Sequence, residues 1–276
     1  MKTLITRTLS GAVYVALIIS AILINDYLFA AVFVVLSALT TFEFHKLTNK
    51  QENVDVNAWL AMIGSIAVYG IFCIALFSDY KEHRQEVDTI FFISCILLLM
   101  FYFYTFIEEI FAKKSNPIHS VAYAFFGLIY AALPFGAMLL IRSENKYFLL
   151  ALFVIIWAND TFAYLVGSRL GKHRLCERIS PKKSWEGFFG GLIGALIAGF
   201  VFSKFCTEIN LWQWLVFALI IVVFGTLGDL FESLIKRTVG VKDSGNIMPG
   251  HGGFLDRLDS VIFSAIPVFI FLLIFN

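Results

Sequence analysis

Charged residues are scarce in this sequence: Asp, Glu, Lys and Arg together make up only 15% of its 276 residues. A typical soluble domain has about 25% charged and about 45–50% apolar residues, whereas 59% of the residues here are apolar. The net charge of +1 leaves no overall basic field to attract a polyanion. The composition therefore excludes a water-soluble globular enzyme, a disordered chain and a nucleic-acid-binding protein.

Cysteine is also rare, with four residues scattered at positions 73, 95, 176 and 206. No two of them form a Cys-x-x-Cys pair, and three lie in or beside apolar runs, where a free cysteine behaves as a small apolar side chain. We therefore expect neither a disulfide framework nor a zinc site.

Long apolar runs dominate the sequence, and a membrane helix needs about 20 mostly apolar residues. The runs do not alternate in polarity as barrel strands do, so they predict an all-α, polytopic integral membrane protein with about nine transmembrane helices. We expect the first run to be a retained helix, since it is too long for a signal peptide and a second run follows at once. The nine runs are residues 8–25, 27–42, 56–78, 89–107, 119–141, 147–168, 187–203, 209–228 (continuing past 228) and 260–276.

The basic residues predict how the chain is oriented. With the N-terminus in the cytoplasm, 16 of the 21 Lys and Arg fall on the cytoplasmic side and five on the other. This bias follows the positive-inside rule and predicts a protein of the cell (inner or cytoplasmic) membrane with its charged loops in the cytoplasm. Charges within or beside the runs gather in the second half, so we divide this single membrane unit into an N-terminal transmembrane scaffold (1–145) and a C-terminal catalytic region (146–276).

Asp160 lies inside the sixth apolar run. A carboxylate at that depth is costly unless it is paired or binds a metal, and such acids are usually functional. Tyr164 and Gly167 share its helix face, and Asn159 lies beside it. We predict a cation or phosphate–metal site at the cytoplasmic mouth of this helix. The alternative is a structural Asp satisfied by an Arg or by backbone groups.

The loop between the sixth and seventh runs is strongly basic. Near its end two lysines are flanked by hydroxyl groups and a stiffening proline, in the order Ser180, Pro181, Lys182, Lys183 and Ser184. Such a segment, followed by a helix N-terminus, is suited to holding a triphosphate. The alternative is a positive-inside stretch that lies near anionic lipid.

The eighth run continues into a polar helix face. At 100° per residue Asp229, Glu232, Ser233 and Lys236 share one face, with Arg237 at its edge. Two acids followed by two bases at the end of an apolar helix indicate a binding site, with a salt-bridged helix end as the alternative.

A glycine-rich segment leads into the last run. Glycines such as Gly252 and Gly253 allow backbone N–H groups to converge on an anion, and His251 adds only weak evidence of its own. The alternative is an interhelical turn with an N-cap Asp.

Carboxylates follow directly after these glycines. Asp256 and Asp259 are three positions apart on one helix face, and facing Asp229 they would offer oxygen ligands to Mg²⁺. Arg257, between them, is placed to contact a phosphate.

Small residues recur on the seventh run, and the resulting face allows close helix packing, either within the chain or in a homodimer. They are Gly187, Gly190, Gly191, Gly194, Ala195, Ala198 and Gly199.

The polar clusters together closely resemble the phosphatidate cytidylyltransferase (CDP-diacylglycerol synthase) family. The match is gapless over residues 233–259 and consists of Ser233-x-x-Lys236-Arg237, Lys242-Asp243 and Pro249-x-His251-Gly252-Gly253-Phe254-x-Asp256-Arg257-x-Asp259. Two further segments look like motifs of that family, namely Asn159-Asp160-Thr161 and Ser180-Pro-Lys-Lys-Ser-Trp-Glu-Gly187, in which Ser184 replaces the usual threonine.

The resemblance implies a nucleotidyltransferase of phospholipid biosynthesis that converts CTP and phosphatidate into CDP-diacylglycerol and pyrophosphate. It implies Mg²⁺, with a second cation as an option, held by Asp229, Asp256 and Asp259 with Asp160 as a weaker fourth ligand. The implied catalytic residues are Asp229, Ser233, Lys236, Arg237, His251, Asp256 and Arg257. The implied substrate contacts are Asn159, Asp160, Ser180, Lys182, Lys183, Ser184, Gly252 and Gly253.

Two other functions stay open on the sequence alone. A CTP-dependent lipid-alcohol kinase would also use a membrane-embedded nucleotide site, although the Pro-x-His-Gly-Gly and Asp-Arg-x-Asp run favours the transferase. An ion-coupled transporter would also carry acids on glycine-rich helices, but transporters of that kind often have repeated halves, and here the charge is confined to one half. The expected partners are the two substrates, membrane lipid and, as an option, a second copy of the chain.

Overall fold

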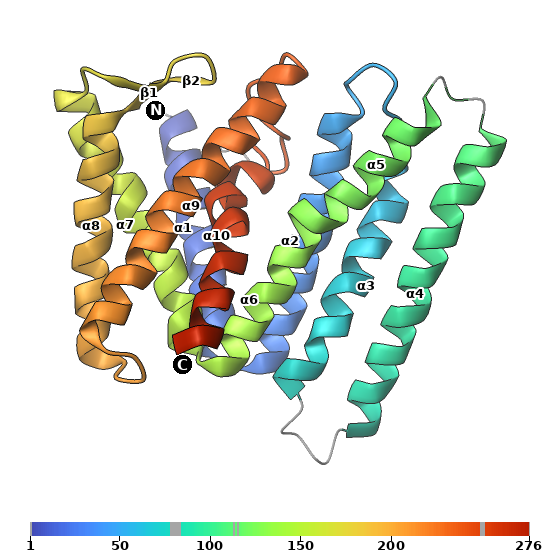
Figure 1. Ribbon diagram of the computed structural model, residues 1–276, viewed down its shortest axis with the longest axis horizontal. Helices are drawn as coiled ribbons and strands as arrows, with labels where there is room; N and C mark the ends of the chain where they lie inside the picture. Colours follow the sequence, from blue (N-terminus) through green and yellow to red (C-terminus); the bar gives the residue numbers. More distant parts are fainter. Residues whose placement is uncertain (1, 78–83, 113, 115, 249–251, 276) are drawn as a thin grey trace.

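The protein is described by a computed structural model that covers residues 2–77, 84–112, 114, 116–248 and 252–275. Nearly all of it is helical (Figure 1). The helices are α1 (Lys2–Leu23), α2 (Asp26–Thr48), α3 (Ala58–Phe77), α4 (Arg84–Phe111), α5 (Pro117–Gly127), α6 (Leu133–Glu144), α7 (Lys146–Leu170), α8 (Trp185–Phe205), α9 (Leu211–Thr238) and α10 (Leu255–Phe275), with a π-helical turn η2 (Leu128–Ala132) between α5 and α6.

These helices confirm an all-α polytopic membrane protein. Eight segments of the described chain are long and apolar enough to cross a membrane, and the segment Pro117–Glu144 contains α5, η2 and α6. The first predicted span corresponds to α1, whose apolar part is the shorter stretch Thr8–Leu23. The predicted hairpin of the first two spans is also present, since α1 ends at Leu23 and α2 begins at Asp26. The Asn25 side chain caps α2 by accepting a hydrogen bond from Leu28 N at 2.7 Å.

The helices lie in three groups from one end of the molecule to the other (Figure 1). α1, α7, α8, α9 and α10 form one end, α3, α4 and α5 form the other, and α2 and α6 lie between them. Only 17% of the apolar window of α4 is buried within the protein. Its large apolar side chains therefore face the region where lipid would lie.

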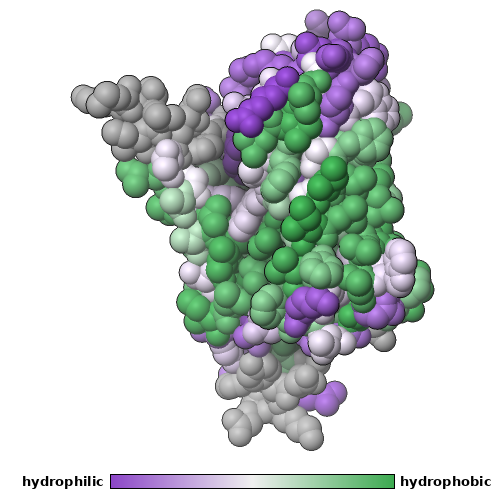
Figure 2. Space-filling model, turned by 90° about the vertical axis from the view of Figure 1, so that its left-hand side faces the viewer, coloured by the Kyte–Doolittle hydropathy of each residue, from purple (hydrophilic) through white to green (hydrophobic). Residues whose placement is uncertain are grey.

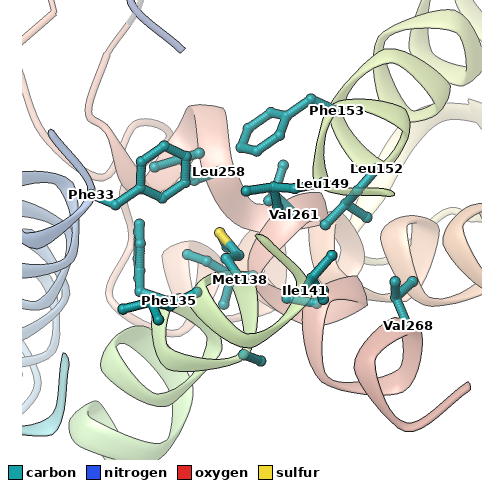
Figure 3. Packing of buried hydrophobic residues seen from close by; sticks show 14 of the residues in the cluster. Phe33, Phe135, Met138, Ile141, Leu149, Leu152, Phe153, Leu258, Val261 and Val268 are labelled. Atoms are coloured by element: carbon teal, nitrogen blue, oxygen red, sulfur yellow. The ribbon is translucent and has the colours of Figure 1, made fainter. Parts of the chain in front are cut away.

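The hydrophobic core joins the two halves of the sequence. Phe33 of α2 meets Phe135 of α6 and Phe153 of α7, with ring centroids 6.4 and 6.1 Å apart. Figure 3 shows these rings beside Leu258 of α10. All four side chains are fully buried, so the predicted division at residue 145 does not separate two cores.

The surface of the α7–α9 end has the polarity expected of a membrane protein (Figure 2). Apolar side chains cover the middle of this face, and hydrophilic side chains gather at the end that carries the short strands. A surface in contact with the hydrocarbon core of a bilayer needs such an apolar band, because polar groups that face lipid tails lose their hydrogen bonds to water.

Most glycines of α8 pack against α7 of the same chain, whereas Gly199 packs against α9. A Cβ atom on Gly190 would lie 2.5 Å from Val166 Cβ, and one on Gly194 would lie 2.6 Å from the ring of Phe162. Glycine at these positions lets the two helices approach each other closely. A homodimer stays a prediction, since this packing neither requires nor prevents one.

The basic loop differs from its prediction, because it contains a β-hairpin. Strand β1 (Arg174–Cys176) pairs antiparallel with β2 (Ser180–Ser184), and Trp185 N donates to His173 O at 2.9 Å. The expected proline-stiffened loop is therefore a strand. Pro181 is compatible with it, because a two-stranded sheet consists only of edge strands, where a missing N–H is tolerated.

We expect Gly190→Ala to lower the thermal unfolding temperature in detergent, because its Cβ would collide with Val166, and overpacking typically costs about 1–3 kcal/mol. Gly225→Ala is the matched control, since its Cβ would meet Ser264 Oγ at 3.4 Å, an ordinary contact. An unchanged unfolding temperature for Gly190→Ala would contradict the close α7–α8 packing.

Candidate active site

A cavity of about 570 Å³ lies between α7, the β-hairpin, the first turn of α8 and the C-terminal half of α9. Gly167 and Gly187 on its wall allow α7 and α8 to touch, since a Cβ on Gly187 would lie 3.0 Å from Ala163 O and 3.2 Å from Gly167 Cα. Six residues predicted from the sequence line this cavity, namely Asn159, Asp160, Lys182, Lys183, Ser184 and Asp229. The structure therefore brings together motifs that lie up to 70 positions apart.

An ion pair crosses the cavity from the hairpin to α9. Lys183 Nζ lies 2.5 Å from Asp229 Oδ2, and both side chains are partly exposed to the cavity. Ser233 Oγ donates to the other oxygen, Oδ1, of Asp229 at 3.3 Å. Because Ser233 is one turn further along α9, the polar face predicted for this helix is confirmed.

Two further carboxylates lie near this pair. Asp160 accepts a hydrogen bond from Asn159 Nδ2 at 3.3 Å and is close enough to Asp229, Lys183 and Arg257 for their charges to interact. Asp259 likewise lies within electrostatic range of Asp229 and Asp160. Acids from α7, α9 and α10 thus lie within electrostatic range of one another, an arrangement that favours binding of an additional cation.

Asp256 belongs to a second, separate polar cluster. Its Oδ1 accepts a hydrogen bond from Lys236 Nζ at 2.7 Å, and its Oδ2 accepts from Ser244 N, Ser244 Oγ and Gly253 N, each at 2.9 Å. Lys236 also pairs with Glu232, which is fully buried. This cluster joins α9, the glycine-rich loop and the first turn of α10.

The expected cluster of Asp229, Asp256 and Asp259 does not form as a closed metal site. Within the described ranges, no three His, Cys, Asp or Glu side chains lie close enough together to hold a metal ion by themselves. Asp229 and Asp259 lie near the cavity, whereas both oxygens of Asp256 already accept hydrogen bonds. The role of Asp256 as a metal ligand stays a prediction.

Three other predicted residues take part in local structure. Ser184 Oγ accepts from Gly187 N at 3.1 Å and caps α8, and Arg237 Nη1 donates to Val241 O at 3.0 Å beyond the end of α9. Ser180 begins β2 and is half-buried. These contacts leave the predicted substrate or catalytic roles of all three untested.

Described residues on both sides of 249–251 in the glycine-rich loop contact Asp256. Gly252 has a φ of +86°, and a Cβ there would lie 2.6 Å from Asp256 Oδ2. Glycine is required at such a position because a side chain would be strained as well as crowded. His251 lies outside the described residues.

Two acidic residues outside our predicted site set also hold this region together. Glu43 of α2 is 2% exposed and accepts a hydrogen bond from Leu255 N at 2.9 Å. Glu186 accepts from Lys172 N at 3.1 Å and contacts His173 Nδ1 at 2.6 Å, so it fixes the base of the hairpin. The sequence offered a signal for each residue. Glu43 directly follows the end of a predicted span, and Glu186 lies within the 180–187 motif.

Comparison with known proteins identifies the family. A family model described as "Cytidylyltransferase family" matches residues 5–275. The chain belongs to this cytidylyltransferase family. A Staphylococcus epidermidis protein named phosphatidate cytidylyltransferase is 34% identical over 269 residues, which are 97% of this chain and 98% of that protein. Proteins of the same name from Staphylococcus saprophyticus and Staphylococcus aureus are 37% and 36% identical over 223 residues, in each case 80% of this chain and 83% of theirs.

Membership in the cytidylyltransferase family confirms the resemblance predicted from residues 233–259 and extends it over the N-terminal half. It favours a nucleotidyltransferase over the lipid-alcohol kinase and the transporter that the sequence left open. The Staphylococcus epidermidis relative matches 97% of this chain, so the sequence similarity includes the N-terminal helices.

We expect Lys236→Met to destabilise the protein strongly, because it leaves Glu232 and Asp256 buried without their shared base, and such a loss typically costs about 3–5 kcal/mol. Thermal unfolding in detergent measures the effect. Lys242→Met, at an exposed lysine of the following loop, is the control and should unfold like the wild type. Equal unfolding temperatures for both variants would show that the second cluster contributes little to stability.

Proposed function

We propose that this integral membrane protein is a phosphatidate cytidylyltransferase, which forms CDP-diacylglycerol and pyrophosphate from CTP and phosphatidate. The observation that carries the proposal is the cavity in which Lys182 and Lys183 of the hairpin face Asp160 and Asp229 of two membrane helices. The names of the relatives supply the reaction, and the cavity supplies charged groups of both signs at one end of the spans.

The two lysines are suited to bind the triphosphate of CTP. Each ammonium is a compact positive charge with three donors, and both line the cavity. Lys183 pairs with Asp229. A polyphosphate entering the cavity would compete for this lysine and would release an Asp229 oxygen for other partners.

The reaction needs no nucleophile from the protein. A phosphate oxygen of phosphatidate forms a bond to the α-phosphorus of CTP, while the bond from that phosphorus to the oxygen of the departing pyrophosphate breaks. The protein contributes by aligning the two phosphates and by neutralising their charge. We assign Arg257, at the first turn of α10 and within electrostatic range of Asp160, to a phosphate contact in this reaction.

The donor set at the cavity fits Mg²⁺. This ion keeps several waters and usually binds proteins through one or two carboxylates together with substrate phosphates. Asp160 and Asp229 line the cavity and Asp259 lies within electrostatic range of both, so these residues would hold it. When bound, Mg²⁺ neutralises charge on the triphosphate oxygens. A contribution by Asp256 would require its contact with Lys236 to open.

The site is proposed to face the cytoplasm. The hairpin and its flanking residues carry six of the 21 Lys and Arg of the chain, which is the bias that marks a cytoplasmic loop. This orientation presents the cavity to soluble CTP. The acyl tails of phosphatidate would stay in the bilayer, entering sideways between helices while the head group reaches the polar edge.

An assay with phosphatidate and each of the four ribonucleoside triphosphates tests the reaction in detergent. We expect CDP-diacylglycerol and pyrophosphate from CTP alone, with activity lost on chelation and restored by added Mg²⁺. Transfer of the γ-phosphate from CTP to diacylglycerol would instead identify a lipid-alcohol kinase. Equal use of all four nucleotides would contradict the assignment.

We expect Lys183→Ala to raise KM for CTP about tenfold or more, since a hydrogen bond to a charged group contributes about 1.5–3 kcal/mol. Steady-state kinetics at fixed phosphatidate measures it. Arg178→Ala, at an exposed arginine in the turn of the same hairpin, removes an equal charge and should keep KM near the wild-type value. An equal rise in KM for CTP in both variants would show that Lys183 acts only through the general positive charge of the hairpin.

A further inference from the structure

The N-terminal half contributes one carboxylate to the start of α10. Glu43 lies in α2, which otherwise belongs to the predicted scaffold, and its Oε2 accepts a hydrogen bond from Leu255 N across 212 positions of sequence. Leu255 is the first residue of α10 and is fully buried. The first N–H groups of a helix have no partner within the helix, and a negative charge there is stabilising. The Glu43 carboxylate supplies both a hydrogen-bond acceptor and an acidic group at the start of α10.

The glycine-rich loop is shaped to fit this carboxylate. A Cβ on Gly245 would lie 2.6 Å from Glu43 Oε1, and its three nearest atoms all belong to the Glu43 side chain. A Cβ on Gly253 would collide with Glu43 Oε2 and with Ser244 Oγ. The missing side chains of Gly245 and Gly253 thus leave room for one buried side chain from another part of the chain.

Two carboxylates therefore hold the same short segment. Asp256 accepts hydrogen bonds from the backbone N–H groups of Ser244 and Gly253. Glu43 accepts one from the backbone N–H of Leu255, two residues after Gly253. The Asp256 side chain is 6% exposed, and Glu43 is buried as deeply. In such surroundings an unsatisfied N–H is costly, so removal of either carboxylate would favour a different loop conformation.

We propose that Glu43 is a positioning residue for the reaction: it holds the glycine-rich loop and the first turn of α10, and thereby sets where Arg257 and Asp259 lie relative to the cavity. Asp259 is about one turn after Leu255, so a displaced helix start carries it away from Asp229. The catalytic importance of Arg257 and Asp259 rests on the proposed function. The contact of Glu43 with the start of α10 does not depend on that function.

Kinetics separates positioning from simple loss of fold. We expect Glu43→Ala to lower kcat about tenfold or more while KM for CTP changes about twofold or less, because the hairpin lysines are untouched. Glu43→Gln keeps the length and one oxygen acceptor for Leu255 N, so it should recover most of kcat. Glu52→Ala, at an exposed glutamate just beyond α2, is the matched control and should behave as the wild type.

A double-mutant cycle tests the contact itself. Gly245→Ala should lower kcat in the wild-type background, since its Cβ meets the Glu43 carboxylate. In the Glu43→Ala background the same substitution should cost nothing further, because the colliding atoms are gone. An equal cost in both backgrounds would overturn the proposal.

Hydrogen exchange supplies a readout that needs no activity. Amide exchange in the peptide covering 252–258 should become faster in Glu43→Ala and stay slow in Glu52→Ala. If Glu43→Ala does not fold, Gly245→Ala carries the same measurement, and Glu43→Gln should keep the slow exchange of the wild type. Unchanged exchange, or wild-type kcat in Glu43→Ala, would refute the positioning role. If the wild type is inactive and exchange is faster in the variant, the proposed reaction is refuted. The contact between Glu43 and the start of α10 is then still supported.

Discussion

Charged side chains that are partly or fully buried need partners, and this requirement governs how the second half of the protein is assembled. Lys183 of the hairpin meets Asp229 of α9, and Lys236 of α9 meets Asp256 of α10. Each contact links segments that the sequence separates. An unpaired charge at membrane depth is expensive, so these pairs restrict the positions that the hairpin, α9 and α10 can take.

Close helix packing provides the other half of the arrangement. α7 and α8 touch through backbone atoms around Gly167 and Gly187. The hairpin that joins them brings Lys182 and Lys183 to the wall of the cavity that Asp160 also lines. Glycine on α8 thus contributes to the site without contributing a functional group.

Hydropathy alone predicted the membrane helices well, and its errors are informative. The second run was expected to end at residue 42, whereas α2 continues to Thr48. The cause is that Glu43 and His45 are polar, which ends an apolar run on paper, although both are buried by neighbouring helices in the structure. The hairpin was missed because its strands are only three and five residues long, too short to produce a periodic signal.

The sequence by itself determined the membrane location, the approximate spans and the polar side chains that make up the candidate site. These properties depend on the length of apolar runs and on spacing within one helix, which are local along the chain. Only the tertiary structure decided the partnerships: that Asp229 faces the cavity with Lys183, that Asp256 holds a loop beside Lys236, and that Glu43 of α2 reaches Leu255. Such contacts depend on how distant helices pack, and the pattern of a single sequence carries no distance between segments 212 residues apart.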